Sequence, residues 1–214
     1  METAITLAFQ LAVLVFSVVI HEVAHGLTAN ALGDPTAKDA GRLTLNPIRH
    51  LDPVGSVLVP AASLFLGGII FGWAKPVPYN PYNLRVSNRE FGGAIVGAAG
   101  PAANVAVAVI FGLALRTAAL WSSPLDPSAA LPLLEIARAI VIVNVTLAVF
   151  NLVPIPPLDG SKVLFALLPA RWVRARLFLE QAGFLLLLRL IVLFSAWIAP
   201  VVRLVVSLIS GPGS

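Results

Sequence analysis

The sequence predicts an all-α protein that crosses a membrane about four to six times, because of its composition and its long apolar runs. Of its 214 residues, 58% are hydrophobic and 11% are charged, whereas soluble domains are roughly half apolar and a quarter charged. A membrane-spanning helix needs about 20 apolar residues, and such runs cover residues 5–20, 54–73, 91–115, 131–153 and 184–209. We therefore expect one membrane-embedded domain over residues 1–210, followed by a disordered tail or vector remnant at 211–214.

Lysine and arginine concentrate in three loops, as the orientation bias of membrane proteins predicts. We expect these loops, at residues 38–49, 75–89 and 162–176, to face the cytoplasm. Residues 121–130 and the N-terminus hold no lysine or arginine, so both are expected outside. The formal net charge of +4 follows from this bias and gives no reason to expect a nucleic-acid partner.

Two of the apolar runs have an ambiguous path. Residues 54–73 would begin and end on the cytoplasmic side, and their glycines and Pro60 favour a broken or re-entrant segment over a simple span. An ordinary span remains the alternative. The last region, residues 171–209, is interrupted by Arg189, Pro200 and Arg203, so it forms either one long span or two shorter ones.

Ionisable residues interrupt the first apolar run, although a charged side chain at the centre of a span costs roughly 2.5–3.5 kcal/mol. They form the pattern H-E-x-x-H at His21, Glu22 and His25. On a helix the two histidines lie one turn apart on one face and can bind one metal ion, with the glutamate beside them as a general base. A zinc ion there would lower the pKa of bound water to about 7, which suits peptide hydrolysis. The alternative is a histidine pair that hydrogen-bonds across helices or reaches the interface.

A catalytic zinc site needs three protein ligands and an open position, so a further Asp, Glu or His must meet the histidine pair. Asp159, within NLVPIPPLDG, lies between two apolar stretches near the expected depth of the histidines. The prolines before it break the helix, and a new helical run begins at Asp159. Two alternatives stay open: Asp159 only caps that helix, or His50 is the third ligand.

Three motifs, in order along the chain, resemble those of the site-2 protease family of intramembrane metalloproteases. They are HEVAH at residues 21–25, GPAAN at 100–104 and NLVPIPPLDG at 151–160. The connecting stretches AGRLTLNPIRHLDPVGS and FGWAKPVPYNPYNLR are also similar to compact bacterial members. The resemblance covers most of the chain up to about Pro169, and 214 residues leave no room for the PDZ or CBS domains of larger members.

The resemblance implies a zinc metalloendopeptidase of the cell membrane that cuts peptide bonds in or near the transmembrane segments of membrane-anchored proteins, most simply single-pass ones. It implies that His21, His25 and Asp159 are the zinc ligands. Two imidazoles and one carboxylate suit one zinc ion per chain, and from the basic loops we expect this site toward the cytoplasmic side. Glu22 is then the catalytic base.

The resemblance also implies that Asn104 and Asn151 lie near the substrate. For Asn104 the alternative is an interhelical hydrogen bond within a packing seam of small residues. The short stretches at residues 42–45 and 75–80 could form β-strands that pair with an unwound substrate, or they are plain interfacial loops.

Two other functions are compatible with ionisable residues inside a membrane. A divalent-metal transporter would spread acidic or histidine ligands across the full membrane depth, whereas here they gather in one layer beside a general base. A catalytically inactive binding protein would keep the metal for structure only.

Overall fold

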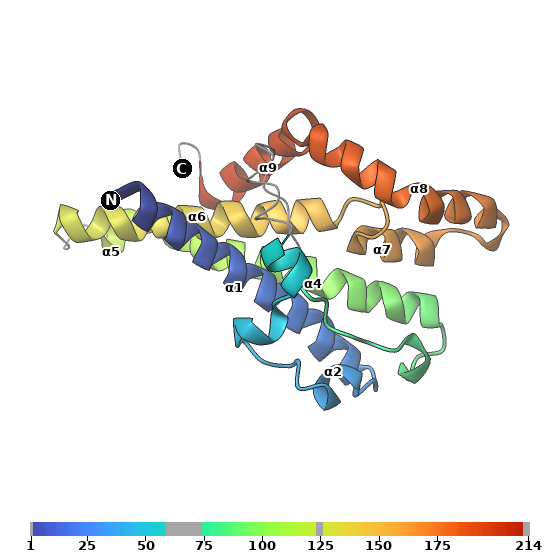
Figure 1. The fold of residues 1–214 in the computed structure, drawn as a ribbon. Helices are drawn as coiled ribbons and strands as arrows, with labels where there is room; N and C mark the ends of the chain where they lie inside the picture. Colours follow the sequence, from blue (N-terminus) through green and yellow to red (C-terminus); the bar gives the residue numbers. More distant parts are fainter. Residues whose placement is uncertain (1, 59–73, 123–125, 212–214) are drawn as a thin grey trace.

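Every regular element in the described part of the chain is a helix (Figure 1). The computed structural model describes residues 2–58, 74–122 and 126–211. The stretches at 42–45 and 75–80, expected as possible β-strands, are extended or bent there but pair with no strand among these residues. Their backbone groups bond instead to side chains and loops, as described below.

Within residues 2–58, 74–122 and 126–211, three helices are long and apolar enough to cross a membrane. They are α1 (Glu2–Ala31), α4 (Arg89–Arg116) and α6 (Pro127–Asn151). In the C-terminal region α8 (Val173–Val192) and α9 (Phe194–Ser210) meet at a bend of 67°, so residues 171–209 form two helices rather than one. Counting the bent pair as one span gives up to four among the described residues, which confirms an all-α multi-pass membrane protein.

The remaining helices are short. The run expected to be re-entrant begins in η2, a π-helix at Pro53–Leu58, and its residues 59–73 lie outside the described part of the chain. The other short elements are α2 (Thr36–Asp39), η1 (Pro47–His50), η3 (Pro81–Asn83), α5 (Ala118–Trp121), α7 (Asp159–Leu167) and η4 (Ala170–Trp172).

Side-chain caps set the starts of two of the long helices. The Asn88 side chain accepts hydrogen bonds from the backbone N–H groups of Glu90 and Phe91 and so begins α4. The Asp126 carboxylate accepts one from Ser128 N–H, and Pro127 follows it as the first residue of α6. These caps satisfy backbone donors that a helix start leaves without partners.

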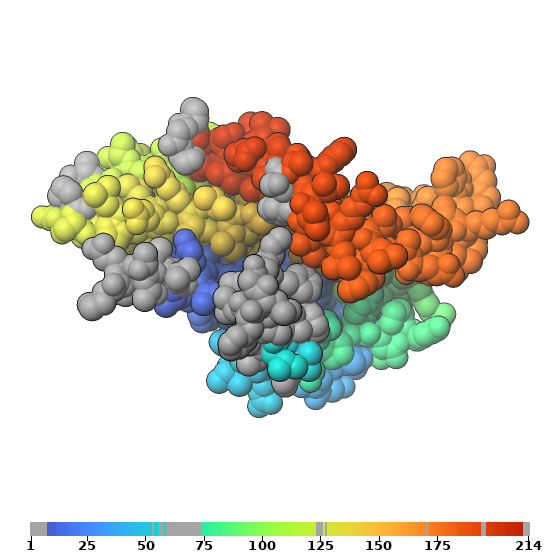
Figure 2. Space-filling model, turned by 45° about the horizontal axis from the view of Figure 1, so that its top comes forward, coloured from blue at the N-terminus to red at the C-terminus, as the bar shows by residue number. Residues whose placement is uncertain are grey.

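Helix α4 lies at the centre of the fold and contacts α1, α6, α7 and α9. Its C-terminal half joins α6 and α9 in an apolar cluster built on Ala108, Val141, Val145, Ile198 and Val202. In its N-terminal half, Gly100 faces the histidines of α1 and Gly97 faces Lys162 of α7, and Figure 2 shows the orange surface of α7 and α8 beside the green surface of the segment that leads into α4.

The molecule has two distinct ends. The start of α1, helix α5 and the end of α9 lie toward one end in Figure 1, and the end of α1, the start of α4 and α7 lie toward the other. Since His21 and His25 belong to the second half of α1, they lie near the end where α7 begins.

Candidate active site

The histidine pair lies on one face of α1, as the H-E-x-x-H spacing predicts. His21 and His25 are both buried, with 5% and 7% of their surfaces exposed. Their rings meet edge to face, with centroids 4.7 Å apart. Because α1 is unbroken here, residues four apart project toward the same neighbours, which are α4 and α7.

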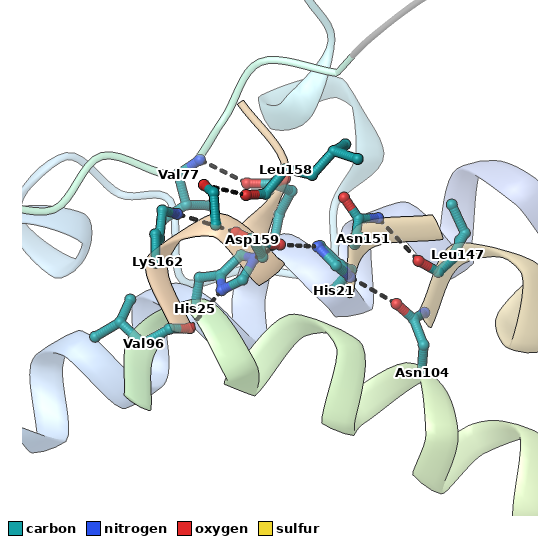
Figure 3. A network of polar contacts seen from close by, with 12 residues as sticks. His21, His25, Val77, Val96, Asn104, Leu147, Asn151, Leu158, Asp159 and Lys162 are labelled. Carbon is teal, nitrogen blue, oxygen red and sulfur yellow. Dashed lines mark hydrogen bonds and ion pairs between the residues drawn. The ribbon is translucent and has the colours of Figure 1, made fainter. Parts of the chain in front are cut away.

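The Nδ1 atom of each histidine meets an oxygen atom (Figure 3). His21 Nδ1 lies 2.6 Å from Asn104 Oδ1, and His25 Nδ1 lies 2.7 Å from the backbone oxygen of Val96. A carbonyl oxygen only accepts, so both Nδ1 atoms carry hydrogen and donate it. In the neutral ring this leaves a lone pair on each Nε2.

Both Nε2 atoms then point at one carboxylate oxygen. Asp159 Oδ2 lies 3.1 Å from His21 Nε2 and 3.1 Å from His25 Nε2. Three electron-pair donors this close repel one another unless a cation lies between them. Protonating both rings instead would place two positive charges at a centroid separation of 4.7 Å. The donor set therefore fits a divalent metal ion bound by two imidazoles and a carboxylate.

A glycine on α4 keeps the space beside these nitrogens open. A Cβ atom added to Gly100 would lie 2.5 Å from His25 Nε2 and 2.6 Å from His21 Nε2. Any other residue would press against the two atoms that face Asp159. Gly100 thus belongs to the site, although the sequence indicated it only as part of the GPAAN motif and the small-residue seam.

Asp159 reaches the histidines because α6 ends early. After Asn151 the chain makes a turn containing three prolines, and Asp159 is the first residue of α7. Leu158 occupies the capping position, and the Asp159 carboxylate instead faces the two Nε2 atoms and accepts a hydrogen bond from Lys162 Nζ, at 3.0 Å. The alternative that Asp159 is the cap of α7 is therefore wrong.

Glu22 lies beside the pair and is held by the segment that precedes α4. Its Oε2 atom accepts a hydrogen bond of 2.7 Å from the backbone N–H of Val77. Glu22, His21 and His25 offer ligand atoms within 4.8 Å of one another, so Glu22 is the rival carboxylate to Asp159 as a third ligand. The position of Asp159 Oδ2, equidistant from both Nε2 atoms, favours Asp159.

Asp34, in the loop after α1, fixes the segment that carries Val77. Its carboxylate, fully buried, accepts hydrogen bonds from Asn80 N–H, Asn83 Nδ2 and Thr36. Burial opposes ionisation of this group, but the hydrogen bonds from Thr36, Asn80 and Asn83 outweigh it and hold the pKa of Asp34 below its usual range. An ionised Asp34 therefore ties residues 80–83 to the end of α1.

Asn104 belongs to a buried polar network that crosses three helices. Its Nδ2 donates to Asn144 Oδ1 on α6 at 2.8 Å and to the backbone oxygen of Ser17 on α1 at 3.2 Å. Asn144 Nδ2 in turn donates to Ser17 Oγ at 2.9 Å. These two donations fix which way the Asn104 amide points and leave its oxygen for His21. The interhelical hydrogen bonds expected as the alternative for Asn104 are therefore present.

The other two candidates lie in different places. Asn151 donates from Nδ2 to the backbone oxygen of Leu147 at 2.9 Å and lines the cavity next to the histidines. His50 is buried with 2% of its surface exposed, and its Nε2 lies 2.8 Å from the backbone oxygen of Thr44. His50 is not among the residues that line the cavity, so the geometry gives it no place beside His21 and His25.

A cavity of about 180 Å³ opens onto the histidines, Glu22 and Asp159. The sequence did not single out several residues of this site, among them Val77, Lys162, Asn144 and Ser17. Lys162 is the one with a local signal, because it stands three residues after Asp159 on the same helix, where opposite charges can pair. The others act through contacts between residues far apart in the chain.

Comparison with known proteins places this site in a family. The family model of Peptidase family M50 matches residues 119–194, a stretch that includes Asn151 and Asp159. YwhC of Bacillus subtilis, described by name as a zinc metalloprotease, is 38% identical over 188 residues, which are 84% of this chain and 78% of YwhC. No solved structure matches the chain significantly.

Proteins named Rip2, with the same description, are similar over a smaller share of their own length. Rip2 of Mycolicibacterium smegmatis is 35% identical over 82% of this chain and 63% of the relative. Rip2 of Mycobacterium tuberculosis is 31% identical over 69% of this chain and 52% of the relative. Fold and relatives together define a multi-pass membrane metalloprotease. The chain belongs to Peptidase family M50, the site-2 protease family expected from its motifs.

Proposed function

We propose that this protein is a zinc-dependent intramembrane endopeptidase that cuts membrane-anchored, single-pass proteins in or near their transmembrane segments. The proposal rests on one observation. His21 Nε2 and His25 Nε2 each lie 3.1 Å from Asp159 Oδ2, inside a bundle of apolar helices. Two imidazoles and one carboxylate suit a single tetrahedral zinc ion with one open position.

Other residues of the chain hold the three proposed ligands in position, as is usual for zinc ligands. Asn104 and the Val96 carbonyl hold the histidine rings, and Lys162 holds the second oxygen of Asp159. When bound, zinc lowers the pKa of water to about 7 and polarises a carbonyl oxygen. Proton transfer and substrate binding depend on side chains of the protein itself.

Glu22 is the proposed general base. Its carboxylate lines the cavity next to the histidines, and the Val77 N–H holds it there. From this position it takes a proton from the attacking water and returns it to the departing amine. Asn151 lines the same cavity and can contact a bound peptide directly, whereas Asn104, fully buried, reaches the substrate only through His21.

The distribution of basic residues supports an orientation with the site toward the cytoplasm and the N-terminus outside. Loops 38–49 and 75–89 and the segment after α7 hold most of the lysines and arginines, and these segments lie toward the end of the molecule where α1 ends and α4 begins. Two exposed serines test this orientation in a chain without cysteine. A cysteine at Ser87 is expected to resist an impermeant outside thiol reagent, and one at Ser128 to react with it. Labelling at Ser87 but not at Ser128 would reverse the orientation.

The experiment that tests the function separates metal binding from proton transfer. Glu22→Gln keeps the side-chain volume and leaves the three proposed ligands in place. Zinc content is therefore expected to stay near one ion per chain, while cleavage of a transmembrane peptide falls by roughly 10²-fold or more, as for the loss of a positioned acid–base group.

Two matched variants locate the third ligand. Asp159→Ala is expected to lose zinc in elemental analysis, whereas His50→Ala retains it. Zinc loss in Glu22→Gln with retention in Asp159→Ala would make Glu22 the ligand instead. Full cleavage by Glu22→Gln, in protein free of contaminating proteases, would rule out the mechanism, and metal flux without cleavage by the wild-type protein would indicate a transporter.

A further inference from the structure

A second cavity, which we call the cationic cavity, lies beside the site and has no role in the chemistry above. It encloses about 340 Å³, within the range of roughly 300–1,000 Å³ typical of ligand pockets. The start of α4, helices α7 and α8, and η3 with Tyr79 before it form its wall. Its charged and aromatic lining residues are Tyr79, Tyr82, Arg89, Lys162, Phe165 and Arg176, together with Glu90.

The cationic cavity shares part of its wall with the active-site cavity. Tyr79 and Lys162 line both. Lys162 Nζ lies 3.0 Å from Asp159 Oδ1 on the active-site side and 5.6 Å from the centroid of the Tyr79 ring. A ligand in the cationic cavity is therefore one side chain away from the proposed metal ligands.

Three glycines of α4 connect the two cavities along one face of the helix. Gly100 faces the histidine nitrogens, Gly97 faces the stem of Lys162, and Gly93 lines the cationic cavity. A Cβ added to Gly97 would lie 3.0 Å from Lys162 Cδ, whereas one added to Gly93 would meet only the Tyr79 hydroxyl, at 3.8 Å. The flexible side chain of Lys162 therefore occupies the space beside this face of α4, between the two cavities.

The charge of the cavity wall favours an anionic ligand. Three cations line it against one carboxylate, and that carboxylate, Glu90, is already ion-paired with Arg176. Arg176 also pairs with Glu180 at 3.0 Å. Arg89 lies with its guanidinium 5.1 Å from the centroid of the exposed Tyr82 ring, and among the described residues no carboxylate lies within ion-pair distance of it. Arg89 is therefore the group left to bind an acid.

We propose that the cationic cavity is a specificity subsite that binds an acidic residue in the substrate segment between the scissile bond and the cytoplasm. The inference rests on the proposed function, since it requires a peptide in the active site. The shared wall favours a polypeptide over a lipid headgroup, because a peptide that reaches the histidines can continue past Lys162 into the cavity. The aromatic rings of Tyr79, Tyr82 and Phe165 provide apolar contact for the neighbouring substrate residues.

The test compares two transmembrane peptides that differ only by Glu or Gln in the cytoplasm-proximal segment. Wild-type zinc-loaded protein in zwitterionic vesicles is expected to cleave the Glu peptide with a kcat/KM higher by roughly five- to tenfold, as for a partly exposed charge-assisted hydrogen bond. Arg89→Gln is expected to bring this ratio close to one. Arg174→Gln removes an exposed arginine of α8 that does not line the cavity, and it is expected to keep the ratio.

A second variant fills the cavity without removing a charge. Gly93→Leu has room for its first carbon and places the rest of the side chain in the cavity, so the ratio is again expected to approach one. Ala106→Leu adds the same side chain to an exposed position of α4 and serves as its control. Zinc content near that of the wild type verifies that each variant is folded.

The outcomes separate the two proposals. Equal cleavage of both peptides by the wild-type protein, or an unchanged ratio in Arg89→Gln and Gly93→Leu, would overturn the subsite and leave the protease intact. Cleavage of neither peptide by zinc-loaded wild-type protein would overturn the proposed function itself. If anionic lipid changes the cleavage of both peptides equally, and Arg89→Gln abolishes that response without affecting the ratio, the cavity binds lipid headgroups and the subsite is wrong.

Discussion

The two halves of α4 are built on the same pattern of small residues but pack against different chemistry. In the N-terminal half, Gly97 and Gly100 make room for Lys162 and for the two histidines. In the C-terminal half, Gly112 makes room for Ile209 of α9, next to the apolar cluster of α4, α6 and α9. Small residues in a membrane helix therefore mark close approach of a neighbour, and the identity of that neighbour decides whether the position serves a site or packing alone.

Among substitutions in α4, adding one methyl group at Gly100 is expected to have the strongest effect on the metal site. The new Cβ of Gly100→Ala would lie within 2.6 Å of both Nε2 atoms. Overpacking of this kind costs about 1–3 kcal/mol, which corresponds to a loss of zinc affinity of roughly fivefold to more than a hundredfold.

Zinc affinity is measured by competition with a chelator, and the melting temperature serves as the control. Alanine is about 1 kcal/mol more favourable than glycine inside a helix, so loss of zinc need not accompany unfolding of α4. Zinc affinity equal to that of the wild type would show that the space at Gly100 does not belong to the metal site.

A smaller effect is expected from Asn144, which acts on the site from α6 through Asn104. Asn144→Leu removes the acceptor for Asn104 Nδ2 and loosens the amide that holds His21. Loss of a partner behind a metal ligand typically costs 10–100-fold in affinity, and one further step away we expect about tenfold.

A double-mutant comparison tests whether Asn144 acts through Asn104. In an Asn104→Leu background, Asn144→Leu is expected to have little further effect on zinc affinity, because the link is already broken. Additive losses would mean that the two asparagines act on the site independently.

The sequence predicted the part of the site that rests on regular helices. The spacing of His21 and His25, the helix break before Asp159 and the apolar runs are local signals, and the structure has all three. Within one helix, geometry follows directly from spacing, so the shared face of the histidines needs no knowledge of the rest of the fold.

The contacts that orient these groups could not be predicted in the same way. Glu22 meets Val77 and His21 meets Asn104 across separations of 55 and 83 residues, and nothing in either local sequence specifies the partner. The absence of a paired strand at residues 75–80 in the described part of the chain has a related reason. The Val77 and Asn80 donors bond to Glu22 and Asp34, so these side chains take the place of a neighbouring strand.

In the C-terminal half of α4, adding one methyl group at Gly112 is expected to change stability slightly and to leave the metal site unaffected. A Cβ in Gly112→Ala would lie 2.2 Å from Ile209 Cγ2, and α9 cannot easily retreat because Arg116 bonds to the backbone oxygens of Leu208 and Ile209. Overpacking costs about 1–3 kcal/mol, and the gain in helix propensity offsets about 1 kcal/mol of it. We expect a net loss of stability of about 0–2 kcal/mol, seen as a slightly lower melting temperature in detergent, with zinc affinity unchanged.

Since Ile209→Ala removes the clashing methyl group, adding Gly112→Ala to it should raise the melting temperature rather than lower it. Loss of zinc affinity in Gly112→Ala, comparable to that in Gly100→Ala, would mean that the two halves of α4 do not act separately.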